Sequence, residues 1–386
     1  MTPVLSRATV QRIACAVVAA EVRRVRGSAL PLPHQWPETM AIGDDGLGLD
    51  SLEQLGALGA LAETFGLDDT MLGREPPRTV GAWIDWIMGR FARGGGHVTV
   101  RTSGSTGRPV PCTHALADLL AETQFLAGYV HERRRVVALV PAHHLYGMIW
   151  TALLPAVLDI PVVTRTVGAS LELAPGDLVI AVPDQWQAIL SLTRGFPTDL
   201  VGVSSGGPLN DALAADLLAS GVARLLDIYG SSETGGIALR EVPARSYRLL
   251  PRWQLLARDD GDWELGDDRG WRHDLPDRIE RVGERDIRPT GRRDGAVQVG
   301  GHNVWPTRVA DMLRTLEGVA DAAVRLHVSG RLKAYIVPAV ERDRSQLTTM
   351  IERAVADRLS MAERPVTLTF GSTLPRNVMG KLEDWT

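Results

Sequence analysis

The sequence contains little lysine, little cysteine and little net charge. Only Lys333 and Lys381 among its 42 basic residues are lysines, so we expect each to be kept for a specific reason. Two cysteines, Cys15 and Cys112, cannot build a disulfide framework, which indicates a reducing compartment such as the cytoplasm. A formal charge of −4 leaves no basic surplus to neutralise phosphates. The composition therefore excludes a protein that binds nucleic acid without regard to sequence.

A hydrophobic run long enough to cross a membrane is also missing. The most apolar stretch, residues 136–163, is interrupted by His143, His144 and several prolines, so we expect it to be buried core. Residues 13–20 are apolar, but the run is short and passes directly into Glu21 and arginines. This pattern favours an amphipathic helix over a signal peptide.

The first quarter of the chain has the apolar spacing of helices. Within residues 1–92 we expect helices at 7–26, from Ser51 to Gly66, and at 79–91. The glycine-rich residues 93–97 are expected to form a linker. The pattern predicts an all-α amino-terminal domain.

The rest of the chain alternates strands with helices. Valine-rich runs in residues 98–293 predict buried strands of an α/β core; they lie at 136–140, 178–182 and 225–229. Residues 294–386 predict a small α+β domain with helices near 306–316 and 345–359. The predicted fold class is therefore multidomain, with helical, α/β and α+β parts in that order.

One motif has the composition of an anion-binding loop. The residues are Thr102, Ser103, Gly104, Ser105, Thr106 and Gly107, directly after an expected strand. Backbone amides and hydroxyls in such a loop can donate hydrogen bonds to a phosphate, and glycines allow close approach. The Gly-Lys-Ser/Thr ending of a P-loop is absent. A serine- and glycine-rich surface turn is the alternative interpretation.

Three further motifs carry groups suited to a nucleotide. The segment Tyr229-Gly230-Ser231-Ser232-Glu233 ends an apolar run, where a tyrosine can stack on a base and a carboxylate can hold Mg²⁺. Asp277 and Arg292 form the third motif, and Lys381 follows a glycine almost at the chain end.

In this order, the four motifs resemble the adenylate-forming superfamily of acyl-CoA synthetases, peptide-synthetase adenylation domains and luciferases. Three further segments match elements of that family: His143–Gly147 beside the acyl pocket, Ser204–Leu209 against adenine, and Gly300–Pro306 facing the pantetheine channel. The resemblance covers about residues 98–386. It implies that a carboxylic acid and MgATP form an acyl-adenylate, from which a thiol then expels AMP.

The resemblance also implies roles for individual residues. Lys381, Glu233 and His144 would be catalytic, Glu233 would hold Mg²⁺, and Asp294 would be the hinge about which the carboxyl-terminal domain swings. The residues implied to bind ATP are Thr102, Ser103, Gly104, Ser105, Thr106, Gly107, Ser205, Gly206, Gly207, Tyr229, Gly230, Ser231, Ser232, Asp277 and Arg292.

Three departures from the family pattern stand out. The first loop continues Pro109-Val110 where the family usually has Pro-Lys. Arg108 or His114 is a candidate replacement for the positive charge; alternatively none is needed, because the lysine of this loop is not the family's main catalytic one. Of the ribose-binding Thr-Gly-Asp only Asp277 remains. The large subdomain that normally precedes the first loop is absent, which makes the α/β core a truncated one. The segment 230–240 looks most like short acid ligases of aryl-polyene and xanthomonadin-type pigment pathways, a branch of secondary metabolism.

The amino-terminal region has a resemblance of its own. Asp50-Ser51-Leu52 at a helix start looks like the phosphopantetheine attachment site of a four-helix acyl carrier protein. That likeness implies 4′-phosphopantetheine on Ser51, added by a phosphopantetheinyl transferase. The alternative is a carrier-like fold kept only for packing.

The sequence therefore predicts an acid–AMP ligase fused to a carrier. The acyl acceptor could be the pantetheine on Ser51, a separate carrier or free CoA. An aryl acid such as a hydroxybenzoate is the expected substrate, with a fatty or β-hydroxy acid as the alternative. An inactive binding module is disfavoured because Glu233, Asp277 and Lys381 are all present.

Overall fold

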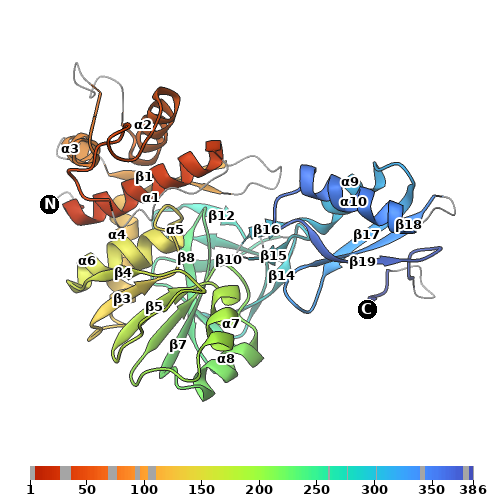
Figure 1. Cartoon of the computed structure of the whole chain (residues 1–386). Helices are drawn as coiled ribbons and strands as arrows, with labels where there is room; N and C mark the ends of the chain where they lie inside the picture. The colour runs from red at the N-terminus through yellow and green to blue at the C-terminus, as the bar shows by residue number, and fades with distance from the viewer. Residues whose placement is uncertain are drawn as a thin grey trace.

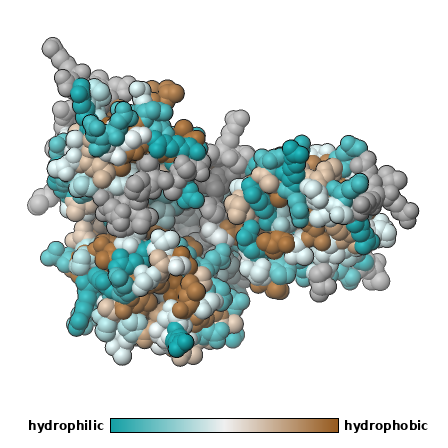
Figure 2. Space-filling view, in the orientation of Figure 1, coloured by the Kyte–Doolittle hydropathy of each residue, from teal (hydrophilic) through white to brown (hydrophobic). Residues whose placement is uncertain are grey.

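The computed structural model describes residues 5–26, 36–67, 76–91, 96–102, 110–259, 261–275, 277–300, 302–339, 344–376 and 382–385. Figure 1 shows a layer of helices at the amino-terminal end, a large sheet flanked by helices, and a smaller unit that carries the carboxyl terminus. In the space-filling view the smaller unit stands to one side of the rest (Figure 2). No helix of the described residues is long and apolar enough to cross a membrane.

The large sheet has nine strands in the order β13-β14-β9-β8-β7-β6-β5-β3-β4. The part from β7 to β4 is parallel, and the part from β7 to β13 is antiparallel. The strands are β3 (Arg135–Ala138), β4 (Val162–Thr164), β5 (Asp177–Ala181), β6 (Val201–Ser204), β7 (Arg224–Ser231), β8 (Gly235–Glu241), β9 (Tyr247–Leu249), β13 (Asp277–Arg281) and β14 (Asp286–Arg292). The three strands predicted from valine-rich runs, β3, β5 and β7, are confirmed.

Alternation along the buried strands assigns the two faces of this sheet. In β3, Val136 and Ala138 join one hydrophobic cluster, whereas Val137 and Leu139 join another. The second cluster contains Trp186 and the buried face of two helices, α7 (Pro183–Leu192) and α8 (Asp211–Ala219). The first contains α4 (Leu116–Ala127), α5 (Leu145–Met148), the π-helix η3 (Ile149–Leu153) and α6 (Leu154–Leu158). Both faces are therefore covered, as a parallel sheet requires.

The amino-terminal helices begin and end where the sequence indicates. They are α1 (Arg7–Arg26), α2 (Ser51–Phe65) and α3 (Val80–Phe91). Asp50 caps α2 by accepting hydrogen bonds from the backbone N–H groups of Leu52 and Glu53, and the Glu53 side chain accepts from Asp50 N–H. This reciprocal capping box satisfies donors that the helix itself leaves unpaired. Gly66 ends the helix with a φ of 61°, a left-handed conformation that favours glycine.

These helices do not stand apart from the α/β core. The buried residues of α1, α2 and α3 belong to the same hydrophobic cluster as α4–α6 and the first face of the sheet. Arg12 Nη2 donates to Thr164 Oγ1 at 3.1 Å and Arg12 Nε to Thr151 Oγ1 at 3.4 Å, which joins α1 to β4 and η3. In place of a free four-helix carrier domain, the described residues of this segment form three helices packed as a layer on the core (Figure 1).

The predicted linker lies partly outside the described residues, which resume at Gly96. Gly96 is packed: its carbonyl oxygen accepts a 2.6 Å hydrogen bond from Leu116 N–H, and a Cβ there would lie 3.0 Å from the Leu116 side chain. The strand β1 (His97–Thr102) follows at once and pairs with β2 (Val110–Ala115). Arg101 of β1 forms an ion pair with Glu63 of α2. The chain is therefore held on α2 and α4 immediately after the predicted linker.

The carboxyl-terminal unit has its own hydrophobic cluster. A three-stranded sheet is formed by β17 (Val319–Leu326), β18 (Leu332–Pro338) and β19 (Pro365–Phe370), and one face is covered by α9 (Pro306–Arg314) and α10 (Arg344–Arg358). The hairpin of β15 (Val297–Val299) and β16 (His302–Val304) leads into it. A small sheet of β10 (Gln254–Ala257), β11 (Trp263–Gly266) and β12 (Arg272–Asp274) lies before β13. The two predicted helices of this unit are confirmed to within two residues.

Candidate nucleotide and acyl site

The predicted site residues gather at one edge of the large sheet. His143 and His144 follow β3, Ser205 follows β6, and Tyr229 lies near the end of β7. Because β3, β6 and β7 belong to the parallel part of the sheet, their carboxyl ends meet at the same edge. The carboxyl edge of an open parallel sheet is where α/β proteins bind nucleotides.

Tyr229 and Asp277 are in direct contact at this edge. The Tyr229 hydroxyl donates a 2.7 Å hydrogen bond to Asp277 Oδ2. Asp277 begins β13 and lies opposite Arg292 in the antiparallel register of β13 and β14. Burial, followed by the nearby Asp277 carboxylate, raises the pKa of Tyr229 well above 10, so the hydroxyl keeps its proton and remains a donor. Three residues predicted from two separate motifs thus form one group.

Arg292 links this group to the predicted hinge. Its Nε and Nη2 donate to the two carboxylate oxygens of Asp294 at 2.9 and 2.7 Å. The bidentate pair raises the pKa of Arg292 and lowers that of Asp294. Arg292 is therefore paired with Asp294 through its side chain and lies opposite Asp277 in the strand register.

The loop after β6 lies beside β7 through close backbone contacts. Ser205 Oγ donates to the Ile228 carbonyl oxygen at 2.9 Å. Gly206 has a φ of 79°, which a side chain would disfavour. A Cβ at Gly230 would lie 2.4 Å from the Gly235 carbonyl oxygen, so only glycine fits where β8 crosses the end of β7. Gly206 and Gly230 are both exposed at this edge.

The turn between β7 and β8 carries hydroxyls and an exposed carboxylate. The hydroxyls of Ser231 and Thr234 lie 3.0 Å apart, and the Thr234 hydroxyl donates to the Gly235 carbonyl oxygen. Glu233 is exposed. Burial, followed by the charge of Glu233, raises the pKa of Cys112 in β2 to about 11. An exposed hard oxygen ligand beside hydroxyl donors suits Mg²⁺ and phosphate. Within the described residues no cluster of three or more metal-binding side chains occurs, so phosphate oxygens would have to complete such a site.

Three residues hold this turn; the sequence had suggested a role only for His114, and Glu122 and Trp253 were not predicted. The His114 ring Nε2 donates to the Ser232 carbonyl oxygen at 2.7 Å, Glu122 accepts from Gly236 N–H at 3.0 Å, and the Trp253 indole donates to the Gly236 carbonyl oxygen at 2.7 Å. Burial lowers the pKa of His114, which disfavours its charged form. His114 therefore positions the turn through its hydrogen bond to Ser232, and its lowered pKa disfavours it as the replacement for the missing positive charge.

The histidine pair starts the segment that leads into α5. Its ring centroids are 4.1 Å apart, and His144 is exposed at the N-cap of α5. His143 Nδ1 is buried and has no hydrogen-bond partner among the described residues, so His143 is not a hydrogen-bonded core histidine at this atom. Desolvation, together with His144, lowers the pKa of His143 to about 3. Tyr146 in the next turn donates to the carbonyl oxygens of β5 and β6, which fixes α5 on the sheet.

Several predicted residues lie outside what the structure describes. These are Ser103–Gly107 and Lys381, and for Thr102 only the backbone is described. The described residues next to Lys381 in the chain are Arg376 and Leu382, and Arg325 of β17 donates a hydrogen bond to the Leu382 carbonyl oxygen. The hairpin β15–β16 lies beside the loop after β6: a Cβ at Gly207 would lie 3.8 Å from Gln298. Ser51 is exposed as the first residue of α2.

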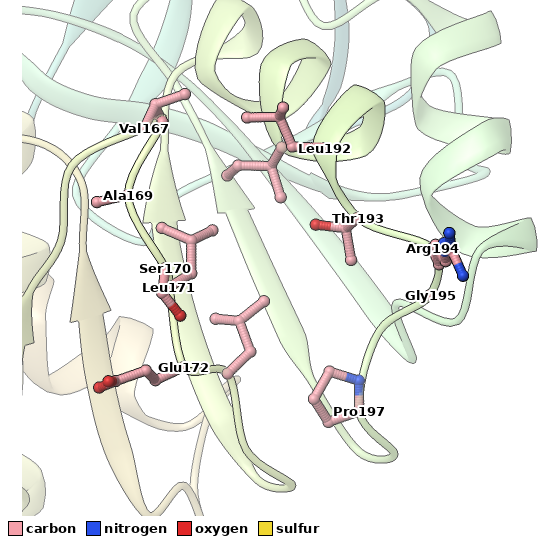
Figure 3. Close-up of a pocket in the computed structure, with 13 residues that line it drawn as sticks. Val167, Ala169, Ser170, Leu171, Glu172, Leu192, Thr193, Arg194, Gly195 and Pro197 are labelled. Carbon is pink, nitrogen blue, oxygen red and sulfur yellow. The ribbon is translucent and has the colours of Figure 1, made fainter.

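A groove of about 390 Å³ lies elsewhere on the molecule. Figure 3 shows it between residues 167–173 and the end of α7 with the residues that follow it, including Leu192, Thr193 and Pro197. Among the predicted site residues that the structure describes, none lines this groove. The groove therefore adds nothing to the site at the sheet edge.

Comparison with known proteins agrees with this geometry. The chain matches the family described as AMP-binding enzyme over residues 100–255. It is 36% identical to a 4-coumarate–CoA ligase of Cereibacter sphaeroides, in a match that covers 99% of this chain and 97% of that protein. A 4-coumarate–CoA ligase of Rhodobacter capsulatus is 38% identical over 97% of this chain and 100% of that protein. Both matches include the helical layer that precedes the family match.

The solved structures extend the likeness in fold. o-Succinylbenzoate-CoA synthetase from Bacillus subtilis superposes with a TM-score of 0.58 at 19% identity, covering 74% of this chain and 67% of that chain. At this identity the likeness concerns the fold alone. It agrees with an α/β core followed by a small carboxyl-terminal unit.

Proposed function

This chain belongs to the AMP-binding enzyme family and is an adenylate-forming acid–thiol ligase; from that premise we propose that it joins an aryl carboxylic acid to the thiol of coenzyme A. The observation that carries the proposal is the group of Tyr229, Asp277 and Arg292 at the carboxyl edge of the sheet. The relatives named for 4-coumarate, and the likeness of segment 230–240 to aryl-acid ligases, support an aryl acid such as a hydroxycinnamate or hydroxybenzoate.

Two half-reactions follow from this assignment. In the first, an oxygen of the acid attacks the α-phosphorus of ATP, the bond to the β-phosphate oxygen breaks, and pyrophosphate leaves. In the second, the CoA sulfur attacks the acyl carbon of the adenylate, AMP leaves with the electron pair, and the thiol proton goes to solvent. Both steps need charge stabilisation at phosphate oxygens by positioned donors.

The chain supplies groups for each part of ATP. Asp277 accepts hydrogen bonds from the ribose hydroxyls, and the Tyr229 hydroxyl fixes its carboxylate. The loop Ser205–Gly207 would lie against adenine, and the hydroxyls of Ser231 and Ser232 with the segment from Thr102 to Gly107 would bind the phosphates. Glu233 would hold Mg²⁺, which would neutralise phosphate charge. Lys381 donates to the α-phosphate.

His144 and the hinge belong to the acyl and thiol side. His144, exposed at the start of α5, borders the acyl pocket. We assign residues 98–293 to the core and 294–386 to a carboxyl-terminal domain that turns about Asp294. One feature supports a domain contact at this edge of the sheet: the β15–β16 hairpin lies beside Gly207 of the core. The two half-reactions would then use two orientations of one domain.

Transfer to a carrier is the second candidate acceptor, and one observation favours it. Ser51 is exposed at the start of a well-capped helix, and Leu52 and Leu55 of the same helix are 79% and 66% exposed. A helix N-terminus favours a bound phosphodiester. One observation disfavours a carrier as the acceptor. The buried residues of α1–α3 belong to the same hydrophobic cluster as the α/β core, so a pantetheine on Ser51 could not move with a separate domain.

The test uses the full chain and a panel of acids. Pyrophosphate release with 4-coumarate, hydroxybenzoates and a β-hydroxy fatty acid identifies the acid, and thioester formation with free CoA identifies the acceptor. We expect the enzyme to form a CoA thioester with an aryl acid. Lys381→Ala should lower the rate of adenylation by at least ~10²-fold, which is the scale of removing one preorganised charge donor. Lys381→Arg should not restore the rate, because a planar guanidinium cannot replace a compact ammonium.

The acceptor has its own decisive measurement. Intact mass is recorded after incubation with CoA and a broad-specificity phosphopantetheinyl transferase, with Ser51→Ala as the matched control. A pantetheine increment that requires Ser51, followed by an acyl increment on addition of ATP and acid, would establish the carrier route. An unmodified chain that still converts free CoA leaves coenzyme A as the acceptor.

A further inference from the structure

The last described residues of the chain lie on one face of the small sheet. Along β18, Ala334 and Ile336 join the hydrophobic cluster under α9 and α10, so Lys333 and Tyr335 point to the opposite face. There they meet residues 382–385, which we call the C-terminal strap. The Trp385 ring packs edge-on against Tyr335 with centroids 5.6 Å apart, and Trp385 is only 7% exposed.

Two cations hold the strap to the sheet. Lys333 is only 4% exposed. Its Nζ donates a hydrogen bond to the Trp385 carbonyl oxygen and forms an ion pair with Asp384 Oδ1 at 2.8 Å. The same Nζ lies 5.2 Å from the centre of the Trp385 ring. Arg325, the register partner of Lys333 on β17, donates from Nη2 to the Leu382 carbonyl oxygen at 2.6 Å. A buried charge is costly unless it is paired and hydrogen-bonded, so these contacts account for Lys333 being buried at all.

The same strap forms one side of a short hairpin. Arg376 and Leu382 form an antiparallel bridge, and Glu383 N–H donates to the Pro375 carbonyl oxygen at 2.8 Å. Only residues 377–381 separate the two bridged positions in sequence, and the last of them is Lys381. Leu382 directly follows Lys381 in the chain. Arg325 donates to the carbonyl oxygen of Leu382, and the backbone of Leu382 pairs with that of Arg376.

We propose that Lys333 is a positioning residue for the adenylation half-reaction: with Arg325 it anchors the C-terminal strap and so fixes Leu382, the residue that directly follows Lys381 in the chain. The inference rests on the proposed role of Lys381 and goes beyond it by assigning the chain's other lysine. A compact ammonium with three donors can meet a carbonyl, a carboxylate and an aromatic ring in one buried place, which a planar guanidinium cannot. This explains why lysine occurs here in a chain that otherwise uses arginine.

The test compares the two half-reactions in the full-length enzyme. Lys333→Met keeps the apolar stem and removes the charge; Trp385→Ala loosens the same strap from its other side. Adenylation is followed by pyrophosphate release with 4-coumarate, and thioester formation is followed with supplied 4-coumaroyl-adenylate and CoA. Ile336→Val, on the helix-facing side of β18, is the control for a general loss of domain stability.

We expect Lys333→Met to lower the maximal rate of adenylation by about 10- to 100-fold, the scale of an ångström-sized misplacement of a catalytic group. KM for ATP and the rate of thioester formation in this variant should stay within about twofold of the wild-type values, because no contact to ATP or to the thioester transition state is lost. Lys333→Arg should not restore the rate. Trp385→Ala should show the same split to a smaller degree, and Ile336→Val should show none.

A second measurement separates positioning from structure. In a Lys381→Ala background, Lys333→Met should reduce adenylation no further, because it acts through the residue already removed. Equal losses in both half-reactions, or full additivity with Lys381→Ala, would overturn the inference. Normal adenylation by Lys333→Met with slow Lys381→Ala would also overturn it while leaving the proposed function intact. Normal adenylation by Lys381→Ala would instead overturn the catalytic assignment in the proposed function.

Discussion

Asp277 accepts a hydrogen bond from Tyr229 and lies opposite Arg292, and this is the contact on which the proposed ribose site depends. Asp277→Ala should raise KM for ATP by about 10-fold or more, because hydrogen bonds to a charged group contribute about 1.5–3 kcal/mol. Tyr229→Phe keeps the ring and loses only the donor, so its effect should be smaller and in the same direction. Initial rates of pyrophosphate release at varied ATP and varied acid measure both variants.

KM for the acid should change little in either variant. Tyr129→Phe, which removes a tyrosine hydroxyl outside this group, serves as the control. If Asp277→Ala leaves KM for ATP unchanged, the ribose lies elsewhere and the nucleotide assignment at the sheet edge is wrong.

Glu122 gives the turn after Glu233 a dependence on pH. Burial raises the pKa of its carboxyl from 4.5 to about 8, although Gly236 N–H donates to it. Between these two values the folded chain holds a proton that the unfolded chain has lost, so this group makes stability fall as pH rises through that window. The carboxyl is neutral at pH 6 and ionised at pH 9, where its charge opposes folding.

We therefore expect Glu122→Gln to be more stable than wild type at pH 8–9 by at least about 1 kcal/mol, with little difference at pH 5. The amide oxygen can still accept from Gly236, so the contact itself is kept. Urea unfolding at pH 5, 7 and 9 measures the difference in unfolding free energy between the variant and wild type. Glu352→Gln, at an exposed position of α10, is the control. A variant that loses stability equally at all three pH values would show that only the contact matters.

At the scale of elements, the β7–β8 hairpin depends on a glycine that no side chain can replace. A Cβ at Gly230 would meet the Gly235 carbonyl oxygen at 2.4 Å, so Gly230→Ala must displace one strand. We expect a loss of about 1–3 kcal/mol in unfolding free energy, as for overpacking, together with weaker ATP binding. Gly59→Ala is the matched control, because nothing lies within 4 Å of its Cβ position in α2. That change should stabilise the chain by about 0.5–1 kcal/mol. Equal effects of the two changes on ATP binding would contradict the close-contact argument.

Local signals predicted the elements better than their assembly. Asp50 and Gly66 mark the ends of α2 by capping chemistry that is contained in the sequence, and the valine-rich runs predicted β3, β5 and β7. The Tyr229 and Asp277 motifs predicted a shared site because both belong to a recognisable family pattern. Glu122 and Trp253 could not be predicted, since they reach Gly236 from elements distant in sequence.

At the scale of the whole molecule, the sequence suggested a separable amino-terminal domain, and the packing shows a layer. Ordinary helical periodicity shows which face of a helix is apolar, yet not what covers that face. Here the buried face of α1 joins the cluster that also contains α4–α6, and Arg12 reaches β4 and η3. The CoA ligase relatives match across this region too. The layer therefore packs on the helices that cover the first face of the sheet and reaches its edge strand β4.

The layer predicts that the amino-terminal helices and the ligase core unfold together. Ile13 is fully buried in α1, so Ile13→Ala should cost about 2–5 kcal/mol, the usual range for a buried truncation. Leu55→Ala, at an exposed position of α2, should change stability by no more than about 0.5 kcal/mol. Urea unfolding followed by fluorescence and by residual adenylation activity should then give one transition that shifts for Ile13→Ala in both signals. An independent carrier domain would behave differently: Ile13→Ala would unfold the helices at low urea while adenylation persisted at the wild-type midpoint.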